Sequence, residues 1–328
     1  MPDLTLCTHA DAARDRDLVP SMTDLVNTAF AEYEGVMQMS VDFMRWYMRR
    51  PGTDTVLCQV AMDGETAVAN VFVATHPLLF RGESSRCGII DSVATLPEYR
   101  HQGLARQLME RAHAAMAAAG LDLSVLYTNP EDHPYRFYQR LGYVTRARID
   151  LLGGPRPADP GHIAVAPALE ADHLAIRSLL AETGGAYDGF PELTDGFWRW
   201  HKLDRPAEAP VLMLVAREGQ HTVGTATYCD TDIAIGGEMH RVSVLSDLAL
   251  APAAPEGTGL ALLAAAPQPR IATLCDTRDP LHALFTELGF AREVSEVAML
   301  LPLNAMGERI AATPPAPWFT MVESVIGV

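Results

Sequence analysis

The sequence predicts an α/β protein with a mixed sheet, built from two similar domains in tandem. Its 328 residues are more than a single domain with one hydrophobic core usually contains. Segments with strand and helix periodicity alternate along the chain. The order of the first half returns in the second, because SVATLP (92–97) parallels DLALAP (247–252) and YRFYQRLGY (135–143) parallels LHALFTELGF (281–290).

The first half contains alternating strand-like and helix-like segments. Ser21 is the expected N-cap of a helix over 21–33. The turn Asp63-Gly64 joins two expected strands. In chain order we expect a strand at 4–9, helices at 21–33 and 41–50, strands at 55–62, 67–75 and 84–95, a helix at 107–120, a strand at 123–128, a helix around 136–142 and a strand at 143–152.

A Gly- and Pro-rich segment, LLGGPRPADPG (151–161), marks the expected boundary between the halves. We therefore predict one domain at 1–152, a second at 162–303 and a tail at 304–328. The second half begins with a helical stretch at 171–183 and continues with strands at 211–218, 222–230 and 241–252.

Composition excludes several classes of function. The net charge of −16 argues against a nucleic-acid groove, which needs a basic surface. An acidic field attracts cationic amines, although solubility alone also explains acidic surfaces. There is no run of eighteen or more apolar residues, and the N-terminus does not resemble a secretory signal. The five scattered cysteines form no CxxC pair, which favours the reducing cytoplasm and argues against a metal site.

The most informative stretch is VATLPEYRHQGLARQLM (93–109). A strand ending at Thr95 leads through a short loop into an amphipathic helix. The free amides and dipole of a helix start favour an anion, and Gly103 allows a close approach to the backbone. The alternative is that this sequence is only a glycine-containing turn followed by arginines on the solvent-exposed face of a helix. The motif is neither a P-loop nor a dinucleotide fingerprint.

RHQGLA (100–105) resembles motif A, [QR]-x-x-G-x-[GA], of the GNAT acetyltransferase superfamily, and YQRLGY (138–143) resembles its second hallmark, Y-x-x-x-G-[FY]. This resemblance implies an acyl-CoA co-substrate, most simply acetyl-CoA, and no metal. It implies two tandem GNAT-fold domains, the second degenerate. The residues that it assigns to the acyl-CoA are Val93, Ala94, Thr95, Arg100, His101, Gln102, Gly103, Leu104, Ala105, Arg106 and Asn129.

The resemblance also implies the catalytic groups. Tyr138 matches the tyrosine that gives a proton to the leaving thiolate, although it could also pack as an ordinary helix-face aromatic. Asp91 matches a frequent acidic position facing the acceptor and is a candidate base, alongside an ordinary strand-edge role. Asp132 and His133 are weaker alternatives. The segment between Asn129 and Tyr138 is about two residues longer than usual, which puts Asn129 in doubt.

Three further residues are candidates for contact with the acceptor. Tyr33, Glu34 and Trp46 lie in the helix–loop–helix that roofs the acceptor pocket in this family, and a simple core role for Trp46 is the alternative.

The second half lacks the corresponding chemistry. At the motif A position it reads APEGTGL (254–260), with Ala254 in place of the arginine and Glu256 repelling a phosphate. Phe285 stands where a phenol is needed. Pro267 and Pro269 shorten the following helix. We expect this domain to serve packing, acceptor shaping or dimerisation.

Tandem chains of this kind resemble the enhanced-intracellular-survival acetyltransferases without their third domain and, less closely, mycothiol synthase. In the former group the C-terminal carboxylate reaches the active site, which the tail here could also do. The expected activity is N-acylation of a small-molecule amine such as an aminoglycoside, amino sugar or polyamine. A longer-chain N-acyltransferase and a non-catalytic acyl-CoA-binding module are the alternatives. We expect no nucleic-acid or membrane partner, and a homodimer is possible.

Overall fold

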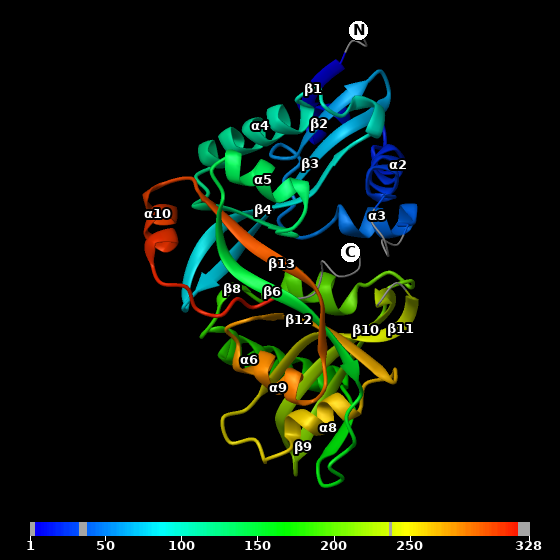
Figure 1. Ribbon diagram of the computed structural model, residues 1–328, viewed down its shortest axis with the longest axis vertical. Coiled ribbons are helices and arrows are strands. Elements are labelled where there is room, and N and C mark those ends of the chain that lie inside the picture. Colours follow the sequence, from blue (N-terminus) through cyan, green and yellow to red (C-terminus); the bar gives the residue numbers. More distant parts are fainter. Residues whose placement is uncertain (1–3, 33–37, 236–237, 321–328) are drawn as a thin grey trace.

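A computed structural model describes residues 4–32, 38–235 and 238–320 (Figure 1). The first half has strands β1 (Leu4–Thr8), β2 (Gln59–Asp63), β3 (Thr66–Phe80), β4 (Glu83–Thr95), β5 (Leu123–Thr128) and β6 (Val144–Pro155). Its helices are α1 (His9–Ala12), α2 (Val19–Phe30), α3 (Val41–Tyr47), η1 (Pro97–Tyr99), α4 (Leu104–Ala118) and α5 (His133–Arg140).

The second half follows a similar order. Its strands are β7 (Ala164–Pro167), β8 (Asp188–Pro191), β9 (Val211–Glu218), β10 (His221–Ile235), β11 (Glu238–Leu250), β12 (Arg270–Asp276) and β13 (Ala291–Pro302). Its helical segments are η2 (Glu170–Asp172), α6 (His173–Gly184), α7 (Asp195–Trp198), η3 (Arg199–Leu203), α8 (Thr258–Ala264), α9 (Pro280–Glu287) and α10 (Ala305–Ala312).

The described strands form one 13-stranded mixed sheet that runs through both halves. The order is β1-β2-β3-β4-β5-β13-β6-β12-β11-β10-β9-β7, with β8 paired to β3. Only the β4–β5 and β11–β12 neighbours within that order are parallel. The α/β class with a mixed sheet is therefore confirmed.

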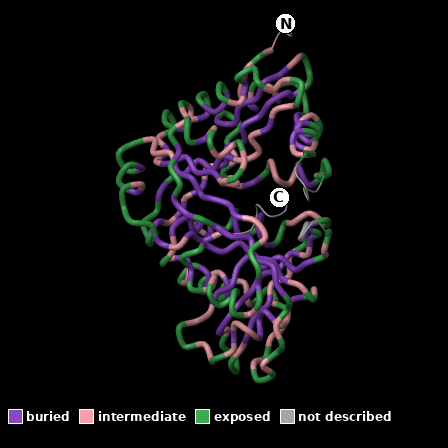
Figure 2. Tube along the Cα trace, viewed as in Figure 1, coloured by how far each residue is buried: buried purple, intermediate pink, exposed green. Residues whose placement is uncertain are grey.

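The two halves exchange their last strands. β6, from the first half, pairs with β12 of the second, and β13, from the second half, lies between β5 and β6. Both strands cross the waist of the molecule in Figure 1, and they run through its buried interior in Figure 2. Each half therefore completes the sheet of the other.

The exchange corrects the expected linker. Residues 151–155 belong to β6 in the middle of the sheet, so the reading of 151–161 as a linker is wrong for this part. A side chain at Gly154 would collide with the Phe290 ring, 2.4 Å from an added Cβ. The glycine that resembles a linker residue thus permits close packing inside the sheet. The limits of the two domains remain a prediction.

Several expected element starts also change, and two of them have a clear local cause. α2 begins at Val19, with Pro20 in its first turn, and the Asp17 carboxylate accepts the Val19 amide at 3.0 Å. Ser21 is therefore inside the helix and not its N-cap, and its hydroxyl accepts the Ala67 amide instead. The strand expected from residue 55 begins at Gln59, because the preceding residues form turns.

Helices cover both faces of the sheet in the first half. α4 and α5 lie on one face, and α2 and α3 lie on the other (Figure 1). α4 buries Leu104, Leu108, Ala112 and Met116 at helical spacing against β2, β3 and β4. Gly88 of β4 lets this helix approach, since an added Cβ would lie 2.1 Å from the Met116 sulfur. This packing fixes the start of α4 beside the end of β4.

Candidate active site

The centre of the candidate site is a gap between two parallel strands. β4 and β5 pair only from Cys87 to Ile89 on one side and from Leu123 to Val125 on the other. Beyond these residues the strands no longer pair, although both continue. The end of β4, which includes Val93 and Thr95, therefore has backbone N–H and C=O groups on its β5 side that make no hydrogen bonds to β5. An extended, amide-containing ligand can hydrogen-bond to such an edge.

A bulge in β4 begins at this gap. The register with β3 shifts between Phe72, opposite Asp91, and Asn70, opposite Ala94. Ser92 has a left-handed backbone, with φ +46°. The Ser92 amide donates to the Asp91 carboxylate at 2.7 Å, and the Asn70 side-chain amide donates to the Ser92 carbonyl at 2.9 Å. A bulge re-aims the following residues, so these contacts set the direction of Val93 to Thr95.

Asp91 also faces Tyr47 of α3. The Tyr47 hydroxyl hydrogen-bonds to the Asp91 carboxylate and lies 3.4 Å from the Ser92 hydroxyl. Burial and the neighbouring Asp91 carboxylate raise the pKa of Tyr47 well above its usual value. Tyr47 therefore remains a protonated donor, and its partner Asp91 is held on the α3 side of the sheet. The sequence pattern did not single out Tyr47.

The loop from Arg100 to Arg106 leads directly into α4. His101 and Gly103 both have positive φ values, +62° and +78°. Gly103 is the N-cap of α4, and no side chain of the described residues caps this end. The first amides of a helix without such a cap are available to an anion, and the helix dipole favours negative charge there. His101, Gln102, Gly103 and Arg106 are exposed, Ala105 is half-buried and Leu104 packs into the core.

The two arginines of the loop have different surroundings. The Arg100 guanidinium donates to the Thr95 and Ala29 carbonyls at 3.2 and 3.0 Å, and to Glu32 at 3.0 Å. It therefore ties α2 to the end of β4. Arg106 is exposed and pairs with Glu110 one helical turn along, at 2.8 Å. Solvated pairs of this kind contribute little, so Arg106 can exchange Glu110 for another anion at low cost.

Tyr138 lies on α5 in the core beside α4 and is 8% exposed. Its ring packs edge-on against Tyr143, with centroids 5.9 Å apart. The Tyr143 hydroxyl shares hydrogen bonds with Ser124 at 2.5 Å and with His113 at 2.9 Å. Burial lowers the pKa of His113 to about 4, so this imidazole is neutral at physiological pH. The network holds the aromatic wall against which Tyr138 rests.

The other predicted site residues are more scattered. The Asn129 side chain accepts the Glu131 amide at 2.8 Å and so stabilises its own turn. Asp132 is the N-cap residue of α5, and His133 is exposed. Trp46 stacks on Trp200 of the second half, with centroids 4.5 Å apart, which makes it a contact between the halves. Tyr33 and Glu34 lie outside the described residues, as does the chain after residue 320.

One acidic side chain reaches this region from the second half. Glu296 lies on the exchanged strand β13, next to Val297, which pairs with Thr128 at the end of β5. Glu296 is 9% exposed. Nothing in the local sequence AREVSEVAML marks it as a site residue, because its position depends on a pairing with the other half of the chain.

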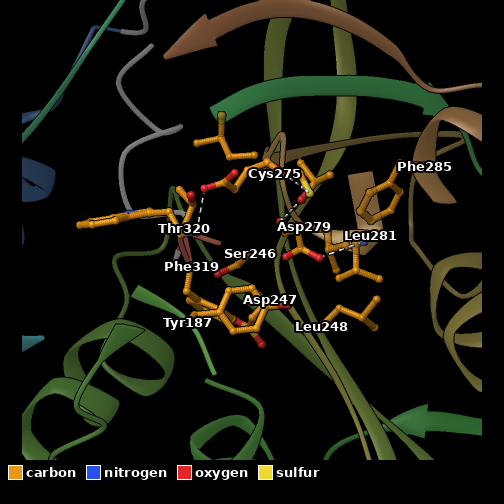
Figure 3. Close-up of a pocket in the computed structure, with 15 residues that line it drawn as sticks. Tyr187, Ser246, Asp247, Leu248, Cys275, Asp279, Leu281, Phe285, Phe319 and Thr320 are labelled. Atoms are coloured by element: carbon orange, nitrogen blue, oxygen red, sulfur yellow. Dashed lines mark hydrogen bonds between the residues drawn. The ribbon is translucent and has the colours of Figure 1, made fainter. Parts of the chain in front are cut away.

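The second half has an equivalent gap, and the chain itself fills it. β11 and β12 pair only from Ser243 to Leu245, and the small pocket beyond is lined by the C-terminal Trp318, Phe319 and Thr320 (Figure 3). The Trp318 amide donates to Asp276 at 2.7 Å, and the indole is 1% exposed. Phe285 takes the place that Tyr138 has in the first half, and α8 is seven residues long against fifteen in α4.

Two classes of feature are not found in the described part of the chain. No helix there has the length and apolar character needed to cross a bilayer. No group of three or more His, Cys, Asp or Glu side chains among those residues is arranged to hold a metal ion. The five cysteines are all unpaired thiols.

Comparisons with known proteins agree with this geometry. Residues 13–145 match the family model described as an acetyltransferase (GNAT) domain. A GCN5-related N-acetyltransferase from Anabaena variabilis superposes with a TM-score of 0.68 at 12% identity, over 92% of this chain and 73% of that one. A probable N-acyltransferase from Enterococcus faecalis gives 0.66 at 14%, over 92% and 72%. No curated protein matches in sequence.

A further solved structure supports the tandem arrangement. The Saccharomyces cerevisiae N-myristoyltransferase, solved with bound myristoyl-CoA, has a TM-score of 0.69 at 11% identity, over 92% of this chain and 83% of that one. It has two GNAT folds, and the likeness extends across both halves of this chain. Residues 13–145 thus form a GNAT acetyltransferase domain, and the fold of the whole chain is consistent with two tandem GNAT folds.

Proposed function

We propose that the first half binds an acyl-CoA, acetyl-CoA in the simplest case, between β4 and β5 and transfers the acyl group to a primary amine. The acceptor is a small cationic molecule such as an aminoglycoside, an amino sugar or a polyamine. The observation that carries this proposal is the coincidence of two features: β4 and β5 separate after Ile89 and Val125, and the uncapped start of α4 lies at the same edge.

The backbone supplies most of the binding in this proposal. The edge of β4 from Val93 to Thr95 pairs with the amides of the pantetheine arm. The pyrophosphate lies at the first turn of α4, where the amides from His101 to Arg106 face it. Since Arg100 already holds Thr95, Ala29 and Glu32, Arg106 is the better placed of the two arginines for a direct phosphate contact.

Tyr138 gives its hydroxyl proton to the departing thiolate. A phenol has an unperturbed pKa near ~10 and is therefore protonated at neutral pH. The aromatic packing against Tyr143 limits the rotation of the ring, which favours a single orientation of the hydroxyl. The net charge of −16 raises the local concentration of a cationic acceptor.

The test measures thiol release from acetyl-CoA with spermidine, glucosamine, kanamycin and a peptide with a free N-terminus. We expect release with at least one amine and a fall of about 10²-fold or more in Tyr138→Phe, the usual contribution of a positioned acid. Tyr135→Phe is the matched control, because Tyr135 lies on the same helix, is half-buried, and has its hydroxyl hydrogen-bonded to Thr145 at 3.0 Å. Equal rates in wild type and Tyr138→Phe would remove Tyr138 from the mechanism.

A donor series separates acetylation from longer-chain transfer. Acetyl-, octanoyl- and myristoyl-CoA are compared with the same acceptor, since the likeness to N-myristoyltransferase covers 92% of this chain. Failure of all three to bind, measured by calorimetry, would overturn the proposed site between β4 and β5.

A further inference from the structure

The exchanged strand places Glu296 on the same face of the sheet as Asp91. Side chains alternate along a strand, and Glu296 shares its face with Ala298, just as Asp91 shares its face with Ile89. Ala298 and Ile89 belong to one hydrophobic cluster. Tyr127 of β5, which packs against that cluster, lies on the strand between them. Glu296 and Asp91 therefore both flank the gap at the ends of β4 and β5.

The environment of Glu296 is costly for a purely structural residue. The side chain is 9% exposed, and its Oε2 atom has no hydrogen-bond partner among the residues that the structure describes. A buried carboxylate with an unsatisfied oxygen costs free energy unless it is paired. Asp91, by contrast, accepts hydrogen bonds from the Ser92 amide and the Tyr47 hydroxyl. Of the two carboxylates, Glu296 has the free acceptor atom.

We propose that Glu296 is the general base of the reaction, so that the second half of the chain supplies a catalytic group to the active site of the first. This inference rests on the proposed acyltransferase function. Asp91 then has a different part: its negative charge attracts the cationic acceptor and increases the proton affinity of Glu296.

The electrostatics of Glu296 suit this role. Burial, and secondarily the Asp91 carboxylate, raise the pKa of Glu296 to about 7, which lies near physiological pH where a base is most effective. The other titratable groups on this face include the hydroxyls of Tyr47 and Tyr127 and, farther along the strands, the Cys87 thiol and the imidazole of its β3 partner His76, while Arg50 lies near Tyr47. Arg148 and Asp150 flank Ile149, which pairs with Glu296, and alternation directs both toward the opposite face.

The proton balance of the reaction closes with this assignment. The acceptor arrives as an ammonium ion and passes one proton to the Glu296 carboxylate. The neutral amine attacks the thioester carbonyl, the C–N bond forms and the C–S bond breaks. Tyr138 protonates the thiolate, and the second proton lost by the nitrogen restores the Tyr138 hydroxyl. Glu296 finally releases its proton to solvent.

The test compares Glu296→Gln with Glu293→Gln, a change of the same chemistry on the same strand. With the amine accepted by the wild type, kcat/KM is measured across pH. We expect Glu296→Gln to lose about 10²-fold or more near neutral pH and to lose the acid limb with a midpoint near 7, while the affinity for acetyl-CoA stays unchanged. Glu293→Gln retains the wild-type profile.

Several outcomes would overturn the inference. If Glu296→Gln is as active as the wild type, Glu296 is not the base, and the proposed acyltransferase function still stands. The same holds if Asp91→Asn abolishes the acid limb and Glu296→Gln keeps it. A wild type that binds no acyl-CoA contradicts the proposed function first. Carbon-13 NMR of carboxyl-labelled glutamate decides without an acceptor: a resonance that titrates near 7 and disappears in Glu296→Gln supports the inference, and its absence refutes it.

Discussion

Replacement of Glu296 by Gln changes how stability depends on pH, independently of any activity. The pKa of Glu296 rises from 4.5 to about 7 on folding, with burial as the first cause and Asp91 as the second. The folded protein therefore holds this proton to higher pH than the unfolded chain does. Its contribution to the free energy of unfolding is complete at low pH and is lost as pH rises through the folded pKa.

The size of the effect follows from that pKa difference. The full loss above the folded pKa corresponds to roughly 3 kcal/mol. Between about pH 5 and about pH 8, the free energy of unfolding of Glu296→Gln should gain about 2.5 kcal/mol over the wild type, because Gln does not titrate.

Urea denaturation followed by circular dichroism at the two pH values measures this difference. Glu293→Gln is the control and should show the same pH dependence as the wild type. If the Glu296→Gln advantage is equal at both pH values, then Glu296 is not a carboxyl group with a raised pKa, and the reasoning is refuted.

Three further predictions concern the two gaps in the sheet. Gly103→Ala places an alanine in the left-handed backbone region, which costs ~1–2 kcal/mol of conformational energy. We expect this variant to bind acetyl-CoA up to about tenfold more weakly by calorimetry. Gly64→Ala, which has the same kind of strain in an open turn, should bind acetyl-CoA as the wild type does. Trp318→Ala removes an indole that is 1% exposed and should lower the free energy of unfolding by about 3–5 kcal/mol in urea; a loss under about 1 kcal/mol would contradict its place in the core. Calorimetry should give one acetyl-CoA per chain, because Trp318 and Phe319 fill the second gap, and two per chain would disprove this.

The features that sequence could predict are local. The start of α4 depends on Gly103 at a left-handed position and on the apolar spacing from Leu104 onward, both of which are written in adjacent residues. The second hallmark likewise lies within α5 and its following turn. The order of the longer strands and helices was therefore predictable, whereas short segments such as β8, α7 and α10 were not expected, and element ends such as the start of α2 at Val19 differ.

The features that sequence missed depend on distant pairing. Gly153 and Gly154 resemble a linker because glycine usually marks turns, but here they allow β6 to pack against β13 and Phe290. Glu296 resembles a solvent-facing residue of an ordinary strand until β13 is placed beside β5. Neither assignment follows from periodicity, since both depend on which half of the chain supplies the neighbouring strand.

The strand exchange explains why the first half needs the second. Trp318 lines the gap of the second half, and Phe285, which has no hydroxyl, lies at the position of Tyr138. Yet β13 covers the free edge of β5, and β12 pairs with β6. An uncovered β5 would leave a row of unpaired amides and carbonyls beside the acyl-CoA site. The same strand that satisfies this edge carries Glu296 to the gap, so sheet completion and the supply of the base are two consequences of one pairing.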